Sequence, residues 1–184
     1  MEIEVSAEAK DKRLNRLVAI TVVVLSVFTG LCNIKDGNIV QAMQAAQSAS
    51  VDTWNQYQAT KTKLHLAEGE RQQLALLAAP GKADAAIAGL DKDIAKYKAE
   101  APDLAKAAKA QGDLYDALNV HDDQFDAADA AISTAISLAA VAALVETGLL
   151  LWAAWAFGAF GLFMGLNGFL GGSFHPSVLS TFLG

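Results

Sequence analysis

Residues 130–174 read AAISTAISLAAVAALVETGLLLWAAWAFGAFGLFMGLNGFLGGSF and contain a single charged side chain, Glu146. One straight helix of this length would extend roughly 67 Å, about twice the hydrocarbon thickness of a bilayer. The stretch is therefore expected to fold back on itself. Glu146-Thr147-Gly148 offers a polar residue and a flexible glycine for the reversal, which gives membrane spans at 130–145 and 149–170. The alternative for Glu146 is a functional carboxylate inside the membrane.

A second uncharged stretch lies near the N-terminus, where residues 17–34 read LVAITVVVLSVFTGLCNI. As a helix it would extend roughly 27 Å, which is long enough to cross a bilayer once. A secretory signal peptide is the alternative, but no A-x-A cleavage pattern follows the stretch, so we expect a retained anchor. Lipid attachment at Cys32 is not expected, because Leu31 before it is not a small residue. A single cysteine also excludes an internal disulfide.

The basic residues predict the orientation of these spans. Lys10, Lys12, Arg13 and Arg16 precede the first span, whereas only Lys35 lies close to its far side. We therefore expect a multi-pass protein of a bacterial inner membrane with a cytoplasmic N-terminal tail, residues 1–16. Three crossings then place residues 35–129 and the C-terminal tail, residues 171–184, in the periplasm.

The segment between the spans is polar, rich in alanine and helical in pattern, with a break at Pro80-Gly81. Its two parts, 36–79 and 82–129, would extend roughly 66 and 72 Å as helices. Two helices of nearly equal length are needed if the chain leaves one membrane face and returns to it. The predicted fold is an all-α membrane protein with three transmembrane helices and a long extramembrane antiparallel helical (coiled-coil) hairpin, whose turn lies at 80–81.

The returning leg of this hairpin has an apolar seam with the spacing of three and four residues that is typical of coiled coils. The seam comprises Ile87, Leu90, Ile94, Tyr97, Leu104, Tyr115, Leu118 and Phe125. The outgoing leg is less apolar, because its seam residues Val40, Met43, Trp54, Tyr57 and Leu64 are interrupted by polar ones. An apolar face with so few large residues predicts that neighbours stabilise the hairpin, either copies of this chain or another complex. The alternative is a mobile hairpin.

Small residues recur every three or four positions through the third predicted span. They are Ala154, Gly158, Gly161, Gly165, Gly168 and Gly172. Missing side chains let another helix approach closely, so this stripe predicts a helix-packing interface. The partner is either the second span of the same chain, which carries its own alanine stripe, or another subunit.

The sequence contains no pattern of residues that indicates catalysis. Its three histidines, His65, His121 and His175, are not expected to converge within one chain, so we predict no metal site, no cofactor and no enzyme activity. The segment 36–129 carries 15 acidic and 9 basic residues, which disfavours binding to nucleic acid.

Four acidic residues are predicted to gather where the hairpin legs meet the outer membrane surface: Asp36, Asp122, Asp126 and Asp129. In a ring of subunits they would form a vestibule that attracts cations. The simpler interpretation is a group of solvated carboxylates that keeps the hairpin out of the bilayer.

Several short stretches resemble a family of small bacterial membrane proteins that is classed as a domain of unknown function. They are residues 2–5 (EIEV), 12–20 (KRLNRLVAI), 32–38 (CNIKDGN) and 52–55 (DTWN). The resemblance implies a helical protein of the inner membrane and supplies no activity. We therefore expect a structural or accessory protein of the lipid bilayer that self-associates or joins a larger membrane complex through its hairpin and its small-residue stripe. The alternative is an oligomeric cation channel with an acidic outer vestibule.

Overall fold

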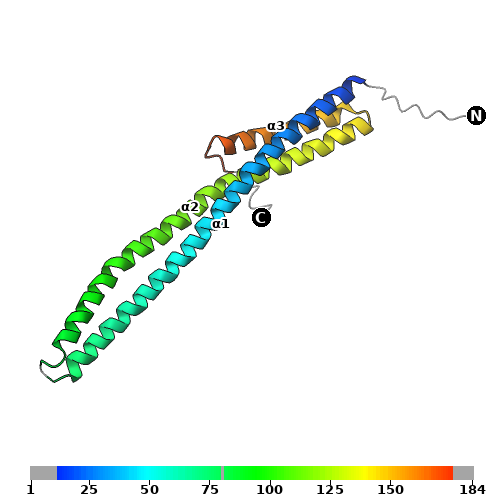
Figure 1. The fold of residues 1–184 in the computed structure, drawn as a ribbon. Helices are drawn as coiled ribbons and strands as arrows, with labels where there is room; N and C mark the ends of the chain where they lie inside the picture. The colour runs from blue at the N-terminus through cyan, green and yellow to red at the C-terminus, as the bar shows by residue number, and fades with distance from the viewer. Residues whose placement is uncertain (1–11, 80, 176–184) are drawn as a thin grey trace, which may run out of the picture. The chain divides into compact units, whose positions relative to one another are not determined.

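The computed structural model describes residues 12–79 and 81–175 of the chain. Over these residues it consists of three helices, α1 (Lys12–Leu77), α2 (Asp84–Leu144) and α3 (Gly148–Phe169), and has no strand (Figure 1). The all-α class predicted from the alanine-rich composition is therefore confirmed. Most of the predicted N-terminal tail, Pro80 and residues 176–184 lie outside the described residues.

The connection between α1 and α2 is short. α1 ends at Leu77 and α2 begins at Asp84. The carboxylate of Asp84 lies in the first turn of α2, where its negative charge interacts favourably with the helix dipole. Between them Gly81 has a φ of 78°, a backbone conformation that glycine adopts without steric penalty. α2 then continues through Pro102 to Leu144 without interruption.

The connection between α2 and α3 is a Schellman-type helix end. The amide of Thr147 donates to the carbonyl of Ala142 over 3.1 Å, and Glu146 between them has a φ of 53°. The sequence predicted that Gly148 would be the flexible residue in the reversal at Glu146-Thr147-Gly148. Glu146 instead takes the left-handed conformation, and Gly148 is the first residue of α3, so this part of the prediction was wrong.

α3 ends in the same way, with a glycine at the left-handed position. Gly171 has a φ of 69°, and the amide of Gly172 donates to the carbonyl of Asn167 over 2.9 Å. Gly172 therefore follows the helix rather than lying on it. Within α3, the predicted stripe of small residues therefore ends at Gly168.

The chain forms two compact units, and α1 and α2 contribute to both. The three-helix unit consists of the described residues up to Gln41, those from Leu118 onward in α2, and α3 with the segment after it. The hairpin unit consists of Ala42–Ala117, in which α1 and α2 lie side by side and antiparallel (Figure 1).

The core of the three-helix unit combines small residues of α2 with larger residues of α1 and α3. Four alanines of α2 are fully buried in it, Ala128, Ala135, Ala139 and Ala142. The larger buried side chains around them are Leu14, Val18 and Leu25 of α1, and Leu151 and Met164 of α3. Small residues on α2 thus let the other two helices pack closely against it.

The seam of the hairpin unit repeats every seven residues on both helices. On α2 the buried or half-buried positions are Ile87, Leu90, Ile94, Tyr97, Ala101, Leu104, Ala108, Gln111 and Tyr115. On α1 they are Met43, Ala46, Ser50, Thr53, Tyr57, Thr60, Leu64 and Ala67. The sequence-based register of the outgoing leg was therefore half wrong, since Trp54 is exposed and the small residues Thr53 and Thr60 occupy the seam.

Each of the three helices contains a stretch long enough and apolar enough to cross a membrane. In α1 this stretch is mostly exposed on the protein, with Ile20, Val23, Val24, Val27, Leu31 and Ile34 all outside the core. Exposed apolar surface of this extent is unusual on a protein in water.

Candidate functional site

The small-residue stripe of α3 faces the interior of the three-helix unit. Ala154, Gly158, Gly161, Gly165 and Gly168 are all buried. A Cβ atom at Gly161 would lie 2.6 Å from a side-chain carbon of Ile132, and one at Gly168 would lie 2.8 Å from the ring of Phe125, both on α2. These two glycines therefore let α3 approach α2.

The other two buried glycines of α3 face α1. A Cβ atom at Gly158 would lie 3.2 Å from a methyl group of Leu25, and one at Gly165 would lie 3.0 Å from the sulfur of Cys32. Cys32 itself is buried. The sequence left open whether the stripe packs within the chain or between subunits, and it predicted only the second span as an intrachain partner. In the structure the stripe packs against two helices of its own chain.

The predicted hairpin seam on α2 is divided between the two units. Ile94 is buried against Leu64 and Ala67 of α1, with Leu90 and Tyr97 beside them. Ile87, Leu104 and Tyr115 are half-buried positions of the same unit, whereas Leu118 and Phe125 belong to the three-helix unit. The ring of Phe125 packs edge to face on Phe169 of α3 at 5.2 Å, so it is a core residue there.

The four predicted acidic residues come together within the three-helix unit. The pKa of Asp36 is raised to about 6, first by burial, then by the nearby carboxyl of Asp122, which is hydrogen-bonded to it, and then by Asp126 and Asp129. The pKa of Asp126 is raised by burial first and then by Asp122. Among the described residues, Oδ1 of Asp36 is buried without a hydrogen-bond partner. Burial of carboxyl groups, together with the crowding of like charges, is therefore the main electrostatic feature of this region.

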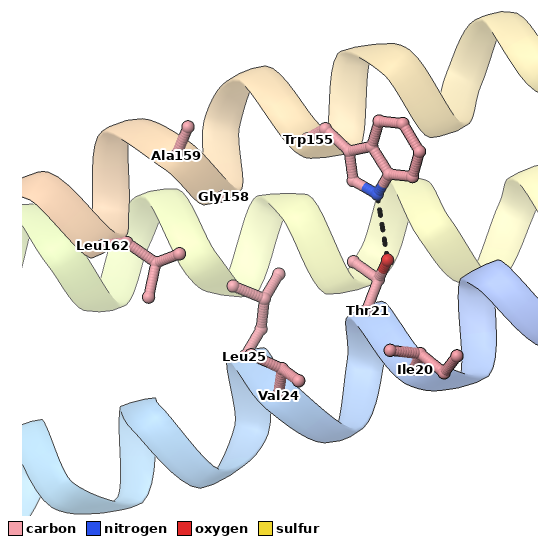
Figure 2. A pocket seen from close by; sticks show the side chains of 8 residues that line it. All are labelled: Ile20, Thr21, Val24, Leu25, Trp155, Gly158, Ala159 and Leu162. Carbon is pink, nitrogen blue, oxygen red and sulfur yellow. Dashed lines mark hydrogen bonds between the residues drawn. The ribbon is translucent and has the colours of Figure 1, made fainter.

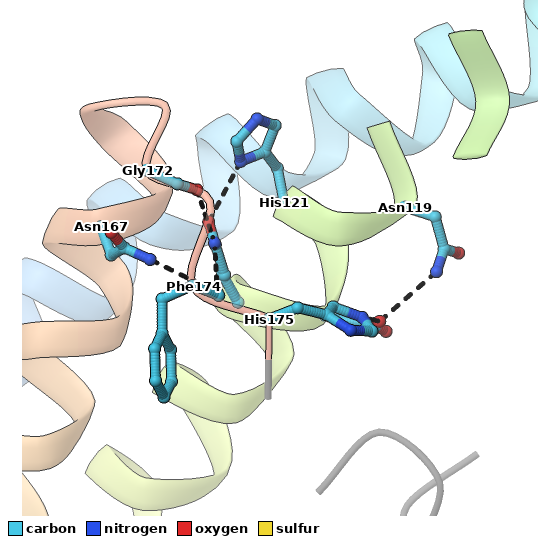
Figure 3. A network of polar contacts seen from close by, with 8 residues as sticks. Asn119, His121, Asn167, Gly172, Phe174 and His175 are labelled. Carbon is cyan, nitrogen blue, oxygen red and sulfur yellow. Dashed lines mark hydrogen bonds and ion pairs between the residues drawn. The ribbon is translucent and has the colours of Figure 1, made fainter. Parts of the chain in front are cut away.

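A polar network next to these carboxyl groups ties the segment after α3 back to α2 (Figure 3). Gln124 of α2 is fully buried, and its Nε2 donates to the carbonyls of Gly172 over 2.9 Å and Phe174 over 2.6 Å. Its Oε1 lies 3.0 Å from Nδ1 of His121. One amide side chain thus donates to two backbone carbonyls, and Nδ2 of Asn167 also donates to that of Phe174 over 3.4 Å.

His175 joins the same network from the other side. Its Nε2 lies 2.6 Å from Oδ2 of Asp123, to which Asn119 also donates (Figure 3). His121 and His175 thus contact neighbouring residues of α2, Gln124 and Asp123. His65 lies in the hairpin unit beside Glu68.

The sequence did not predict this polar network, because the network depends on the chain folding back after Phe169. The Gly171-Gly172 pair is the one signal that could have predicted this reversal. Within residues 12–79 and 81–175, no group of three or more His, Cys, Asp or Glu side chains is arranged to hold a metal ion.

The fold thus defines an all-helical protein with three helices long and apolar enough to cross a membrane. Residues 14–171 match the family described as Domain of unknown function (DUF4337), and the chain belongs to that family. No curated protein and no solved structure matches the chain.

Proposed function

We propose that the chain is an integral protein of a bacterial inner membrane with three spans, a cytoplasmic N-terminus, and a hairpin unit and C-terminal tail in the periplasm. The exposed apolar surface of α1 and the charge-free stretches of α2 and α3 support membrane insertion. The basic residues before the first span support the orientation.

Single cysteines provide a direct test of this topology. In a Cys32→Ser background, cysteines at Ala79 in the hairpin connection and at Glu146 should lie on opposite sides of the membrane. A reagent that cannot cross the membrane should label position 79 from the periplasm of intact cells and position 146 only after lysis. Labelling of both positions in intact cells would contradict the proposal.

Within the membrane we propose a structural or accessory role, in which the protein self-associates or joins a larger membrane complex through its hairpin unit. One observation carries this proposal: large apolar side chains remain exposed on the most polar part of the chain. They are Val51, Trp54, Leu66, Leu76, Leu77 and Leu114. Leu76 and Leu77 at the end of α1 are 75% and 83% exposed. Adjacent exposed leucines such as these two favour contact with another protein surface.

The test is the mass of the protein purified in mild detergent, together with the identity of any stoichiometric partner. The wild-type chain should purify as a homo-oligomer or with a second protein. Leu76→Ser combined with Leu77→Ser should release the assembly, whereas Ala79→Ser, a change at a neighbouring exposed position, should not. A wild-type chain that is monomeric and without a partner would contradict the role.

An oligomeric cation channel is the second candidate, and the gathering of Asp36, Asp122, Asp126 and Asp129 favours it. Replacing Asp122, Asp126 and Asp129 by Asn should abolish cation conductance of a channel in planar bilayers. The same replacement should leave the mass and partners of an accessory protein unchanged. Absence of conductance in the wild-type chain would exclude the channel.

A further inference from the structure

An open groove runs between α1 and α3 in the three-helix unit (Figure 2). Its volume is about 320 Å³, and its lining residues are Ile20, Thr21, Val24 and Leu25 of α1, and Trp155, Gly158, Ala159 and Leu162 of α3. An apolar cavity of about 150 Å³ is large enough to bind benzene. The groove can therefore take a longer apolar group.

The polar atoms in the groove already have partners. Trp155 Nε1 donates to Thr21 Oγ1 over 2.9 Å, and the other lining side chains are apolar (Figure 2). A ligand that needs hydrogen bonds would find little to bind here, whereas an alkyl chain would not lose any. The depth of the groove comes partly from Gly158, since a side chain there would approach Leu25.

A positive charge lies next to one end of the groove. Arg16 is exposed and precedes Ile20 by four residues, which places both on one face of α1 about 6 Å apart along its axis. In the proposed topology Arg16 is at the cytoplasmic surface, where lipid phosphates lie, and the groove begins just below it. Basic residues at this depth attract anionic headgroups.

The geometry points to a binding site for one anionic phospholipid of the cytoplasmic leaflet, with an acyl chain in the groove and its phosphate near Arg16. This inference rests on the proposed membrane topology. It also gives Trp155 a role, because its ring forms one wall of the groove while its indole nitrogen is bonded to Thr21.

Tryptophan fluorescence tests the inference, because brominated acyl chains quench a tryptophan that they touch. One variant keeps only Trp155, through Trp54→Phe and Trp152→Phe; a second keeps only Trp152, which is exposed and outside the groove. Both are reconstituted in phosphatidylcholine vesicles that contain a minor fraction of brominated phosphatidylglycerol or, in parallel, of brominated phosphatidylcholine.

Brominated phosphatidylglycerol should quench Trp155 more strongly than brominated phosphatidylcholine does, by the about fivefold enrichment expected for one basic side chain near an anionic headgroup. Trp152 lies outside the groove but packs edge to face on Trp155 at 5.1 Å, so it should distinguish the two lipids less than Trp155 does. Arg16→Gln should remove the preference, whereas Lys35→Gln, at the other end of the first span, should keep it. Ala159→Phe fills the groove and should also remove it, whereas Ala156→Phe, at an exposed position outside the groove, should not.

Equal quenching of Trp155 by the two lipids would overturn the site. Protection of Trp155 from both lipids while Trp152 is quenched would also overturn it, and would indicate that a second copy of the chain covers the groove. If neither tryptophan is quenched by any brominated lipid, the helices are not in the bilayer, and the proposed membrane topology fails as well.

Discussion

Gly165 of α3 and Phe28 of α1 lie so close that a Cβ atom at position 165 would come within 2.6 Å of the Phe28 ring. The ring in turn packs edge to face on Phe169, with 6.2 Å between the ring centroids. Movement of Phe28 to make room would therefore disturb a second contact. The close approach of α1 and α3 depends on the absence of one side chain.

Gly165→Ala should therefore destabilise the three-helix unit by about 1–3 kcal/mol, the usual effect of an added methyl group in a packed core. Thermal unfolding in mild detergent measures the change. The control is Gly30→Ala in α1, where a Cβ atom would meet nothing within 4 Å. An alanine favours the helix there, so the control should be neutral or slightly stabilising. Equal effects of the two changes would contradict the close packing at Gly165.

Gln124→Leu should release the segment after α3. The change removes the donor to the carbonyl of Gly172 and the shorter of two hydrogen bonds to that of Phe174, which is expected to destabilise the protein by about 1–3 kcal/mol. Limited proteolysis should then cut the chain between residues 171 and 175 faster. Gln73→Leu, an exposed position in α1, is the control and should not alter the cleavage rate. Unchanged cleavage in the Gln124 variant would refute the role of this side chain.

The raised pKa of Asp36 predicts that stability falls as the pH rises from about 4 to about 6. The folded protein holds a proton on this carboxyl group over that range, whereas the unfolded chain has already released it. Folding is therefore favoured at the acidic end, and the advantage is lost as the pH passes the folded pKa. Midpoints of thermal unfolding measured across this range provide the test.

Asp36→Asn should flatten this pH dependence and raise the midpoint at neutral pH, because a neutral side chain has no burial penalty from charge. Asp116→Asn, at an exposed position of α2 in the hairpin unit, should leave the profile unchanged. The idea fails if the wild-type protein becomes more stable between about pH 4 and about pH 6.

Hydropathy and helix-breaking residues were sufficient to predict an all-helical chain with breaks near 80–81 and 146–148, because apolar length and glycine or proline positions act locally. The register of the outgoing leg was harder to predict. The large residue Trp54 placed the predicted seam one position away from the observed one, which uses the small residues Ala46 and Thr53. Small side chains carry little hydrophobic signal, although two helices can approach closely over them.

The polar network around Gln124 illustrates a different limit. Gln124 lies in a stretch of polar residues and looks like an exposed position, and its burial results from the return of residues 171–175 against α2. The contact spans 48 residues in sequence, so no local periodicity reports it. The acidic cluster was easier to predict, because pairing the two ends of an antiparallel hairpin brings Asp36 and Asp122 together.

The hairpin unit should depend on its few large seam residues rather than on its ion pairs. Leu64 is buried against Ala67 and Ile94, and Leu64→Ala should destabilise the unit by about 2–4 kcal/mol. Glu68 lies one turn further on, and Lys98 Nζ is 2.8 Å from its carboxylate, a contact that lowers the pKa of Glu68. Solvent screens that exposed pair, so Glu68→Gln should have a much smaller effect.

Hydrogen exchange of the amides around the seam, measured on the full chain, separates the two cases. Loss of Leu64 should accelerate exchange on both helices of the hairpin unit, because the seam is thin and its neighbours are mainly Thr, Ala and Tyr. Loss of the Glu68 charge should leave exchange nearly unchanged, and salt should not alter the ranking. If Glu68→Gln accelerated exchange as much as Leu64→Ala, the hairpin unit would depend on its surface charges and not on the seam.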